Sequence, residues 1–173
     1  MKTMFQSNRH SVHVAVLSII LVSMMLTLPG LATLHANNSV LPIPNTHLQP
    51  DEVVEIVLDA LANNDTPYVD AGIETTFNFA SPSNKAQTGP LERFAVMVKG
   101  PVYGVMVGHK SHVLVETVVN NSRAYQMVRL ITAAGAAVHF AFRLGLQPDG
   151  EFEGMWMTEA VWPLEAPVEG TSI

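Results

Sequence analysis

The chain has 173 residues, of which 48% are hydrophobic and 14% are charged, with a formal net charge of −6 and no cysteine. This length and composition suit one domain with one core and do not match a disordered protein. The acidic balance argues against nucleic acid as a partner, because phosphate binding needs clustered Lys and Arg. Without cysteine, stability must come from the core rather than from disulfides.

The N-terminus has the pattern of an export signal. Lys2 and Arg9 precede an uncharged, mostly apolar run over residues 14–28, and small residues follow it. We expect residues 1–36 to be a signal peptide cleaved after Ala36, or three to four residues earlier. Cleavage after Ala36 removes both cations and no acid, so the charge becomes 7 − 15 = −8. The protein would then be exported to the periplasm or the cell exterior, or to a thylakoid lumen.

The alternative is that the N-terminal run stays attached as a membrane anchor, since it is long enough to cross a bilayer at about 20 residues. Membrane association is expected only in that case. Residues 37–49 contain Pro42 and Pro44 and are interpreted as a linker. The folded domain should then occupy residues 50–163, and residues 164–173 should form a flexible tail.

Three helices are predicted before any strand. The first opens at Pro50 and ends at Asn63 to Asp65, with proline and acids in its first turn. The second is expected over residues 68–79, with Thr66 as its capping residue, and the third over residues 91–98. On the first helix, the apolar face and the acidic face are separate. The apolar residues are Val54, Val57, Leu58 and Leu61, and the acids are Glu52, Glu55 and Asp59.

Residues 77–94 join the second and third helices and are mostly polar. We interpret them as a crossover at a rim, where the helices turn back over a sheet. Ser81 and Ser83 flank Pro82, so they are expected to be turn and cap residues rather than nucleophiles.

From His112 onward, the hydrophobic period changes from helical to alternating, which predicts four strands. They should cover residues 112–119, 124–132, 138–146 and 152–161, with turns that contain Asn, Gly, Pro and Asp. Helices followed by an antiparallel meander indicate an α+β fold, in which three N-terminal helices pack on a curved four-stranded antiparallel sheet to form a cone or roll.

Both faces of this sheet are expected to be apolar. One face would carry Leu114, Val118, Met127, Val138, Phe140 and Phe142, and the other Val113, Val115, Val128, Leu130, Ala141 and Trp156. Because a face in water usually carries polar residues, we expect the helices to cover one face and a second subunit to cover part of the other, in a symmetric homodimer. The alternative is a monomer whose sheet curls around its own core.

Several short segments together resemble an uncharacterised bacterial and plant family known only as a domain of unknown function. They are Phe79-Ala80-Ser81-Pro82-Ser83-Asn84, Gly89-Pro90-Leu91-Glu92-Arg93-Phe94, Tyr103 and Gly154-Met155-Trp156-Met157-Thr158-Glu159. The resemblance covers about residues 48–163. It implies an α+β cone like that of nuclear transport factor two and ketosteroid isomerase, also called cystatin-like, and it supplies no active residues.

The resemblance implies a hydrophobic pocket between the helices and the concave face of the sheet. In the expected register, His139 lies opposite Leu130 and near Thr158, with Trp156 one step along. An indole offers stacking area and an imidazole can transfer a proton near neutral pH. We therefore name Tyr103, His139, Trp156 and Thr158 as candidate ligand-binding residues, whereas His139 could also be a hydrogen-bonded sheet residue at a subunit contact.

Two other groups of residues give weaker evidence for a functional site. His109 and His112 are close together, but no Cys or well-placed carboxylate completes a metal-binding set, so no metal and no cofactor are expected. Tyr68 and Asp70 could imitate the acid and base of an isomerase, but they are two residues apart and would face different ways on a helix.

The sequence leaves three functions open. The protein could be an exported, non-catalytic module that binds a small hydrophobic ligand or another protein. It could be a small isomerase, cyclase or hydrolase that uses His139 as acid or base. It could also be a structural accessory of an envelope or membrane complex. The absence of a recognisable catalytic set favours the first and third functions.

Overall fold

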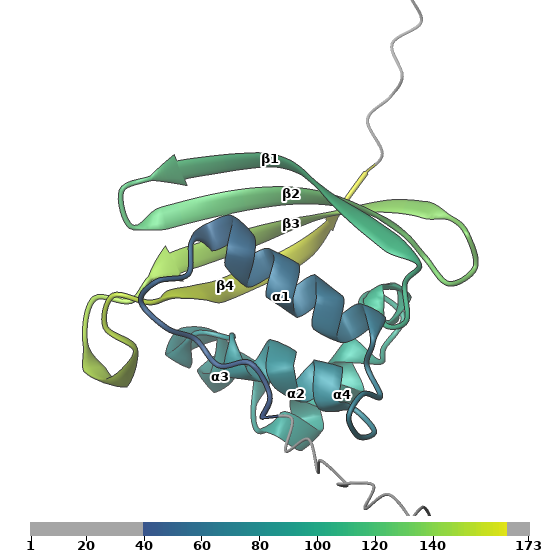
Figure 1. The fold of residues 1–173 in the computed structure, drawn as a ribbon, viewed down its shortest axis with the longest axis horizontal. Coiled ribbons are helices and arrows are strands. Elements are labelled where there is room, and N and C mark those ends of the chain that lie inside the picture. Colours follow the sequence, from purple (N-terminus) through teal and green to yellow (C-terminus); the bar gives the residue numbers. More distant parts are fainter. Residues whose placement is uncertain (1–39, 166–173) are drawn as a thin grey trace, which may run out of the picture. The chain divides into compact units, whose positions relative to one another are not determined.

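The computed structural model describes residues 40–165, so the predicted signal peptide, the first residues of the predicted linker and most of the predicted tail lie outside the described residues. Within this range, four helices precede four strands (Figure 1). The helices are α1 (Pro50–Ala62), α2 (Ala71–Asn78), α3 (Pro82–Thr88) and α4 (Leu91–Val98), and the strands are β1 (Ser111–Asn120), β2 (Arg123–Ile131), β3 (Ala137–Leu146) and β4 (Trp156–Leu164). Short 3₁₀ turns cover Gly104–Met106 and Gly150–Phe152. No helix within residues 40–165 combines the length and apolarity that a membrane crossing requires.

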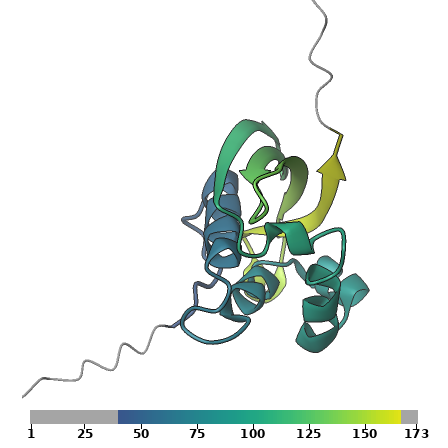
Figure 2. The ribbon, with the colours of Figure 1, turned by 90° about the vertical axis from the view of Figure 1, so that its right-hand side faces the viewer.

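The strands form one antiparallel open sheet in the order β1-β2-β3-β4, which confirms the predicted α+β class and the meander. The sheet is twisted, and the helices gather on one side of it (Figures 1 and 2). Helix α1 contacts β1, β2 and β4, and α2 packs against α1. The helical layer therefore covers one face of the sheet, called here the inner face.

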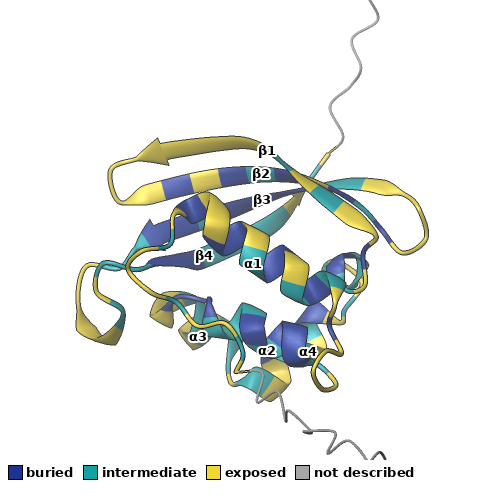
Figure 3. Ribbon diagram, viewed as in Figure 1, coloured by how far each residue is buried: buried dark blue, intermediate teal, exposed yellow. Residues whose placement is uncertain are grey.

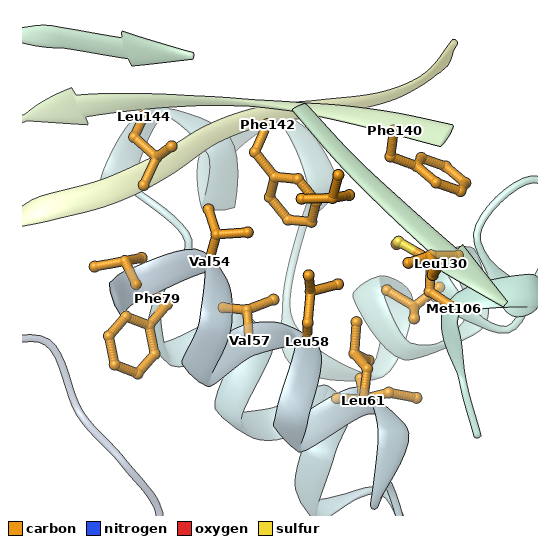
Figure 4. Close-up of a cluster of buried hydrophobic side chains, with 14 of the residues drawn as sticks. Val54, Val57, Leu58, Leu61, Phe79, Met106, Leu130, Phe140, Phe142 and Leu144 are labelled. Atoms are coloured by element: carbon orange, nitrogen blue, oxygen red, sulfur yellow. The ribbon is translucent and has the colours of Figure 1, made fainter. Parts of the chain in front are cut away.

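Helix α1 forms where its capping signals predict it. The Glu52 carboxylate accepts a hydrogen bond from the Gln49 backbone N–H (2.8 Å), and Pro50 occupies the first turn. The side that faces the sheet carries the buried residues Val53, Val54, Val57, Leu58 and Leu61. These side chains meet Phe140, Phe142 and Leu144 of β3 in the hydrophobic core (Figure 4).

Helix α2 begins at Ala71, three residues later than predicted, so the expected cap at Thr66 is wrong. Its N-cap residue is Asp70, in a left-handed conformation with φ of 66°. The buried amide of Asn64 causes the delay, because it donates to the Asp70 carboxylate (3.1 Å) and accepts from the Ile73 backbone N–H (3.2 Å). These bonds hold the connection as a compact turn. Sequence propensity does not reveal them, since they join Asn64 to residues six and nine positions later.

Helix α3 lies within the predicted polar crossover, where no helix was expected. Residues 40–165 therefore contain four helices before the sheet rather than the predicted three. Ser81 is its N-cap and accepts a hydrogen bond from the Asn84 backbone N–H (3.2 Å), which confirms Ser81 as a cap residue. The seven residues of α3 include none that is buried. A helix without a buried face leaves no apolar periodicity in the sequence, so the hydrophobic pattern does not predict it.

The predicted pairing between β2 and β3 was wrong by one residue. Leu130 pairs with Val138 rather than with His139, because the connection between the two strands spans residues 132–136. A slip of one residue moves every side chain to the other face of the sheet. Val128 and Leu130 therefore lie on the inner face together with Phe140, and not on the face of Ala141 as expected.

The predicted pairing between β3 and β4 was wrong by a larger step. Thr158 pairs with Leu144, and His139 pairs with Leu164. Strand β4 begins at Trp156 rather than at residue 152, because the 3₁₀ turn Gly150–Phe152 occupies the expected strand start. A bulge between Arg143 and Leu144 shifts the register once more.

The outer face of the sheet has no helix over it. Its exposed apolar side chains include Val113, Val118 and Tyr125, with exposed fractions of 58%, 49% and 42%. Strand β2 alternates between buried and exposed residues, while β1 is exposed over most of its length (Figure 3). The outer face also carries Glu116, Arg129 and Arg143, so the expectation of two apolar faces holds only in part. Ala141 and Met157 on this face are nevertheless buried.

Candidate functional site

A cavity of about 220 Å³ lies between the helices and the end of the sheet formed by β3 and β4. All four helices contribute to its wall, together with the segment around the first 3₁₀ turn and the two strands. The apolar lining residues are Val57, Leu61, Ala80, Phe94, Met97, Val98, Met106, Phe142, Ala160 and Val161, and the polar ones are Thr76, Asn84, Gln87, Thr88, Tyr103, Thr158 and Glu159. A mostly apolar wall with a few polar groups is the usual make-up of a small-molecule site.

The segment between α2 and α3 forms one wall of the cavity because it pairs with β4. The Thr158 N–H donates to the Phe79 carbonyl (2.8 Å), and the Ser81 N–H donates to the Thr158 carbonyl (2.9 Å). Ala80 and Thr158 thereby form a parallel bridge. The Asn84 side-chain amide also donates to the Thr158 carbonyl (3.1 Å). These bonds attach the helical layer to the strand at the position of Thr158.

The side-chain hydroxyl of Thr158 is buried and unpaired. Thr158 is 6% exposed, and its hydroxyl oxygen has no hydrogen-bond partner among the described residues. An unpaired buried hydroxyl costs about 1–3 kcal/mol, and native structures contain few such groups. Thr158 lines the cavity, but this oxygen is itself buried, so its side chain must rotate before the oxygen can bond a polar group of a bound molecule.

Tyr103 enters the same cavity from the segment before the first 3₁₀ turn. Its hydroxyl donates to the Val161 carbonyl (3.0 Å), and its ring packs near that of Phe140 at 6.5 Å between centroids. The phenol oxygen keeps the capacity to accept a hydrogen bond. Tyr103 therefore joins the helical layer to β4 and presents an aromatic wall.

Glu159 gives the cavity an acidic side chain. It occupies the bulge in β4, and the Nε of Arg143 donates to its carboxylate at 3.0 Å. Gly145 makes room for it, because a Cβ at that position would clash with the carboxylate. The ion pair balances the charge of Glu159 at the rim of an otherwise mainly uncharged site.

The structure brings together two of the four candidate residues. Tyr103 and Thr158 line the cavity, whereas Trp156 and His139 are not among its lining residues. Trp156 is 9% exposed in the core and pairs with Leu146. The corrected register places His139 opposite Arg129 and Leu164, beside a separate depression, so the expected cluster of His139 with Thr158 does not form.

His139 shares one property with Thr158. Its Nδ1 is buried and has no hydrogen-bond partner among the described residues. No carboxylate within residues 40–165 forms an ion pair with it.

The pair of Tyr68 and Asp70 is also separated. The Tyr68 hydroxyl donates to Glu74 at 2.8 Å, and this hydrogen bond raises the pKa of the phenol. Asp70 pairs with Lys99, which lowers the pKa of the carboxyl below its ordinary value of 3.8. Each group has its own structural partner, so the two do not form a catalytic pair.

A second polar cluster lies at the contact of α1 with β1. Glu55, Asp59 and His112 each place a possible metal-ligand atom within 4.8 Å of the others. The sequence alone did not assign a carboxylate to His112 and His109, because Glu55 and Asp59 precede the histidines by about 50 residues. The spacing of four between these two acids, on the exposed side of α1, was the available signal.

Residues 45–169 match the family model described as a domain of unknown function (DUF4864). This match covers most of the chain, and the chain therefore belongs to that family. It also confirms the resemblance to an uncharacterised family, over slightly more of the chain than expected. No curated protein and no solved structure is significantly similar to the chain.

Proposed function

We propose that this member of a family without an assigned function is a non-catalytic binding module, whose cavity takes a small, mainly apolar molecule with one hydrogen-bonding group. The observation that carries the proposal is that Thr158 lines the cavity while its buried hydroxyl has no hydrogen-bond partner among the described residues. A ligand would recover the hydrogen bond that folding leaves unmade. Its apolar part would lie against Phe94, Met97 and Phe142.

The residues that line the cavity support binding more than catalysis. Among the cavity's lining residues, Glu159 is the one carboxylate, and it is engaged by Arg143. No histidine lines the cavity. The proposal includes the cone of nuclear transport factor two and ketosteroid isomerase, in which a ligand would sit between the helices and the concave face of the sheet.

Straight-chain alcohols from butanol to octanol provide a direct test, because each joins an apolar body to one hydroxyl. We expect saturable binding by calorimetry, with heteronuclear NMR shifts at Thr158 and Val161. Thr158→Val removes the hydroxyl at nearly constant volume and should weaken binding about 5- to 10-fold, the value of one hydrogen bond of about 1 kcal/mol.

Thr75→Val is the matched control. Thr75 is buried, its hydroxyl donates to the Ala71 carbonyl (2.9 Å), and it is not among the residues that line the cavity. It should leave alcohol binding unchanged. Equal alcohol binding by Thr158→Val and wild type would show that the hydroxyl takes no part, and shifts that map elsewhere would show that the cavity is not the binding site. Native mass spectrometry of protein from its own host would then show which molecule, if any, is retained.

We also propose that a second copy of the chain covers the outer face, giving a symmetric homodimer. The exposed Val113, Val118 and Tyr125 support this, and Val118 and Tyr125 are cross-strand partners on β1 and β2. The same face carries Glu116 and Arg129, so a two-fold axis could set acid against base. A structural accessory role in an envelope complex would use the same face for another protein.

Sedimentation equilibrium tests the dimer. Val118→Asp should convert a dimer to a monomer, since it places a charge within the apolar face. Val96→Asp is the control, because Val96 is 75% exposed on α4 and lies on the helical side of the fold. A wild-type monomer at tens of micromolar would contradict the homodimer and favour a different partner.

We propose that the protein is exported and acts in the periplasm, outside the cell or in a thylakoid lumen. Its support is the N-terminal pattern of cations, apolar run and small residues over residues 1–36. Mass spectrometry of the protein from its own host should find a mature N-terminus at Asn37. An intact N-terminus in the membrane fraction would instead identify an anchor.

A further inference from the structure

The cluster of Glu55, Asp59 and His112 joins the helical layer to the first strand. Glu55 and Asp59 are one turn apart on α1, so their side chains extend from the same side of the helix. His112 is the second residue of β1 and pairs with Leu130 on β2. The cavity described above uses Val57 and Leu61, which lie on a different side of α1. This cluster is therefore a separate site.

The distances suit a shared cation. Nε2 of His112 lies 3.3 Å from a carboxylate oxygen of Glu55 and 3.9 Å from one of Asp59. In a tetrahedral site with bonds of about 2.0–2.1 Å, neighbouring ligand atoms are about 3.3 Å apart. Small rotations of two exposed side chains would bring all three atoms to that spacing, because Glu55 and Asp59 are 50% and 68% exposed.

A hydrogen-bonded relay determines which nitrogen of His112 faces the carboxylates. Nδ1 of His109 lies 2.7 Å from the Met106 carbonyl oxygen, which can only accept, so this nitrogen carries the hydrogen. In the neutral ring of His109, Nε2 is then the acceptor, and it lies 2.8 Å from Nδ1 of His112. His112 must therefore donate from Nδ1, so Nε2 is the nitrogen that faces the carboxylates.

Nε2 of His112 lies between two hydrogen-bond acceptors. The His112 side chain is 9% exposed, and its Nε2 faces the carboxylates of Glu55 and Asp59. Only a proton on Nε2 or a cation between the three groups resolves this arrangement. Within residues 40–165, no Lys or Arg forms an ion pair with Glu55 or Asp59. Two negative charges thus converge on one imidazole.

We propose that Glu55, Asp59 and His112 bind a divalent transition-metal ion, with Zn²⁺ as the reference ion. One imidazole and two carboxylates form a mixed nitrogen and oxygen ligand set that such ions accept. The relay through His109 to the Met106 carbonyl is the outer hydrogen bonding that metal-bound histidines usually have. Three protein ligands leave at least one position for water, and the exposed carboxylates leave a path to solvent.

The expected consequence is a link between two layers of the fold. The ion would connect the middle of α1 to the start of β1, close to the point where the Gly108 N–H donates to the Leu61 carbonyl (2.9 Å). Binding to the folded state alone would raise its stability with increasing metal concentration. His109 would be a positioning residue, since it holds the ring of His112 without touching the ion.

The test is calorimetric titration of the metal-free, purified protein with Zn²⁺ alone, paired with a Co²⁺ titration in which the absorption spectrum reports the ligands. We expect one ion per chain. His112→Ala should weaken Zn²⁺ binding on the order of 100-fold and should change the Co²⁺ spectrum. His109→Gln should weaken binding about 10-fold and shift the spectrum, which a merely structural change at His109 would not do.

The double variant Glu55→Gln and Asp59→Asn keeps the proposal testable if His112→Ala fails to fold, because both carboxylates are exposed and lie outside the core. It should lose Zn²⁺ binding while its circular dichroism stays that of the wild type. His47→Ala and Glu92→Gln are matched controls at exposed positions away from the cluster, and they should bind Zn²⁺ as the wild type does.

Two results would overturn the site. One is Zn²⁺ affinity that is the same in the wild type and in the double variant, which would place any bound ion elsewhere. The other is an NMR titration in which His112 remains an imidazolium paired with the carboxylates in the presence of Zn²⁺. The cluster would then be an ion pair between α1 and β1, and alcohol binding in the cavity would be unaffected by either outcome.

Discussion

The two faces of the sheet carry similar apolar side chains and differ in what lies over them. On the inner face, Phe142 and Leu144 are 1% and 0% exposed beneath the helices, whereas on the outer face Val113 and Val118 are 58% and 49% exposed. Burial at about 25 cal/mol per Å² therefore stabilises the fold mainly from one side. A strand pattern reveals which residues could be buried, and only the packing reveals which are.

The largest expected effect is on the inner face. Phe142→Ala removes a buried ring from the core and from the wall of the cavity, so the free energy of unfolding should fall by about 3–5 kcal/mol. Urea denaturation measures this loss. The enlarged cavity should also bind octanol more tightly relative to butanol. A loss below about 1 kcal/mol would mean that the inner face contributes no more than the outer one.

A smaller effect is expected at Gln126, the fully buried polar residue of the inner face. Its side-chain amide donates to the carbonyls of Glu116 and Met127 (both 2.9 Å), and its oxygen accepts from Thr117, beside the bulge in β1. Gln126→Leu leaves those groups unpaired and should lower the free energy of unfolding by about 1–3 kcal/mol. Hydrogen exchange should show faster opening of β1, with β3 and β4 unchanged.

The adjacent residue, Tyr125, provides the matched comparison on the outer face. It is 42% exposed, so Tyr125→Ala should change the unfolding free energy of a dilute monomeric sample by less than about 0.5 kcal/mol. In a dimer, the same change should lower the melting temperature increasingly at high protein concentration, since association stabilises the folded state. A large, concentration-independent loss would show that the outer face is covered from within the chain.

The smallest effect is expected from the exposed ion pair of Asp70 and Lys99 on the helical side. Because the pair lowers the pKa of Asp70, its stabilisation is present above the ordinary carboxyl value of 3.8 and disappears as the pH falls through the lower value in the folded state. Asp70→Asn should cost under about 1 kcal/mol at pH 7, and the difference from wild type should vanish in strong acid. A cost that persists in acid would point to the hydrogen bond with Asn64.

Local signals in the sequence were sufficient for most of the secondary structure. Pro50 with the acids after it marked the start of α1, and the change to alternating hydrophobicity at His112 marked the sheet. Helix α3 was not predicted because it has no buried face. The start of α2 was misplaced because the side chain of Asn64 shapes the preceding turn through hydrogen bonds that residue propensity does not describe.

The candidate site was predictable only in part. Thr158 and Tyr103 lie in the resemblance segments and do line the cavity, but His139 was placed beside Thr158 by a register that was off by one residue at β2 and by several at β4. Register depends on turn lengths and bulges, and a turn that forms a 3₁₀ helix at Gly150–Phe152 cannot be distinguished by composition from a strand start.

By itself, the sequence determined the α+β class and the antiparallel meander, because these follow from period, capping and turn residues close together in the chain. The tertiary structure alone decided which face is covered, which residues share the cavity, and that two carboxylates of α1 meet His112. Each of these depends on contacts between residues far apart in the sequence, and no local pattern encodes the distance between them.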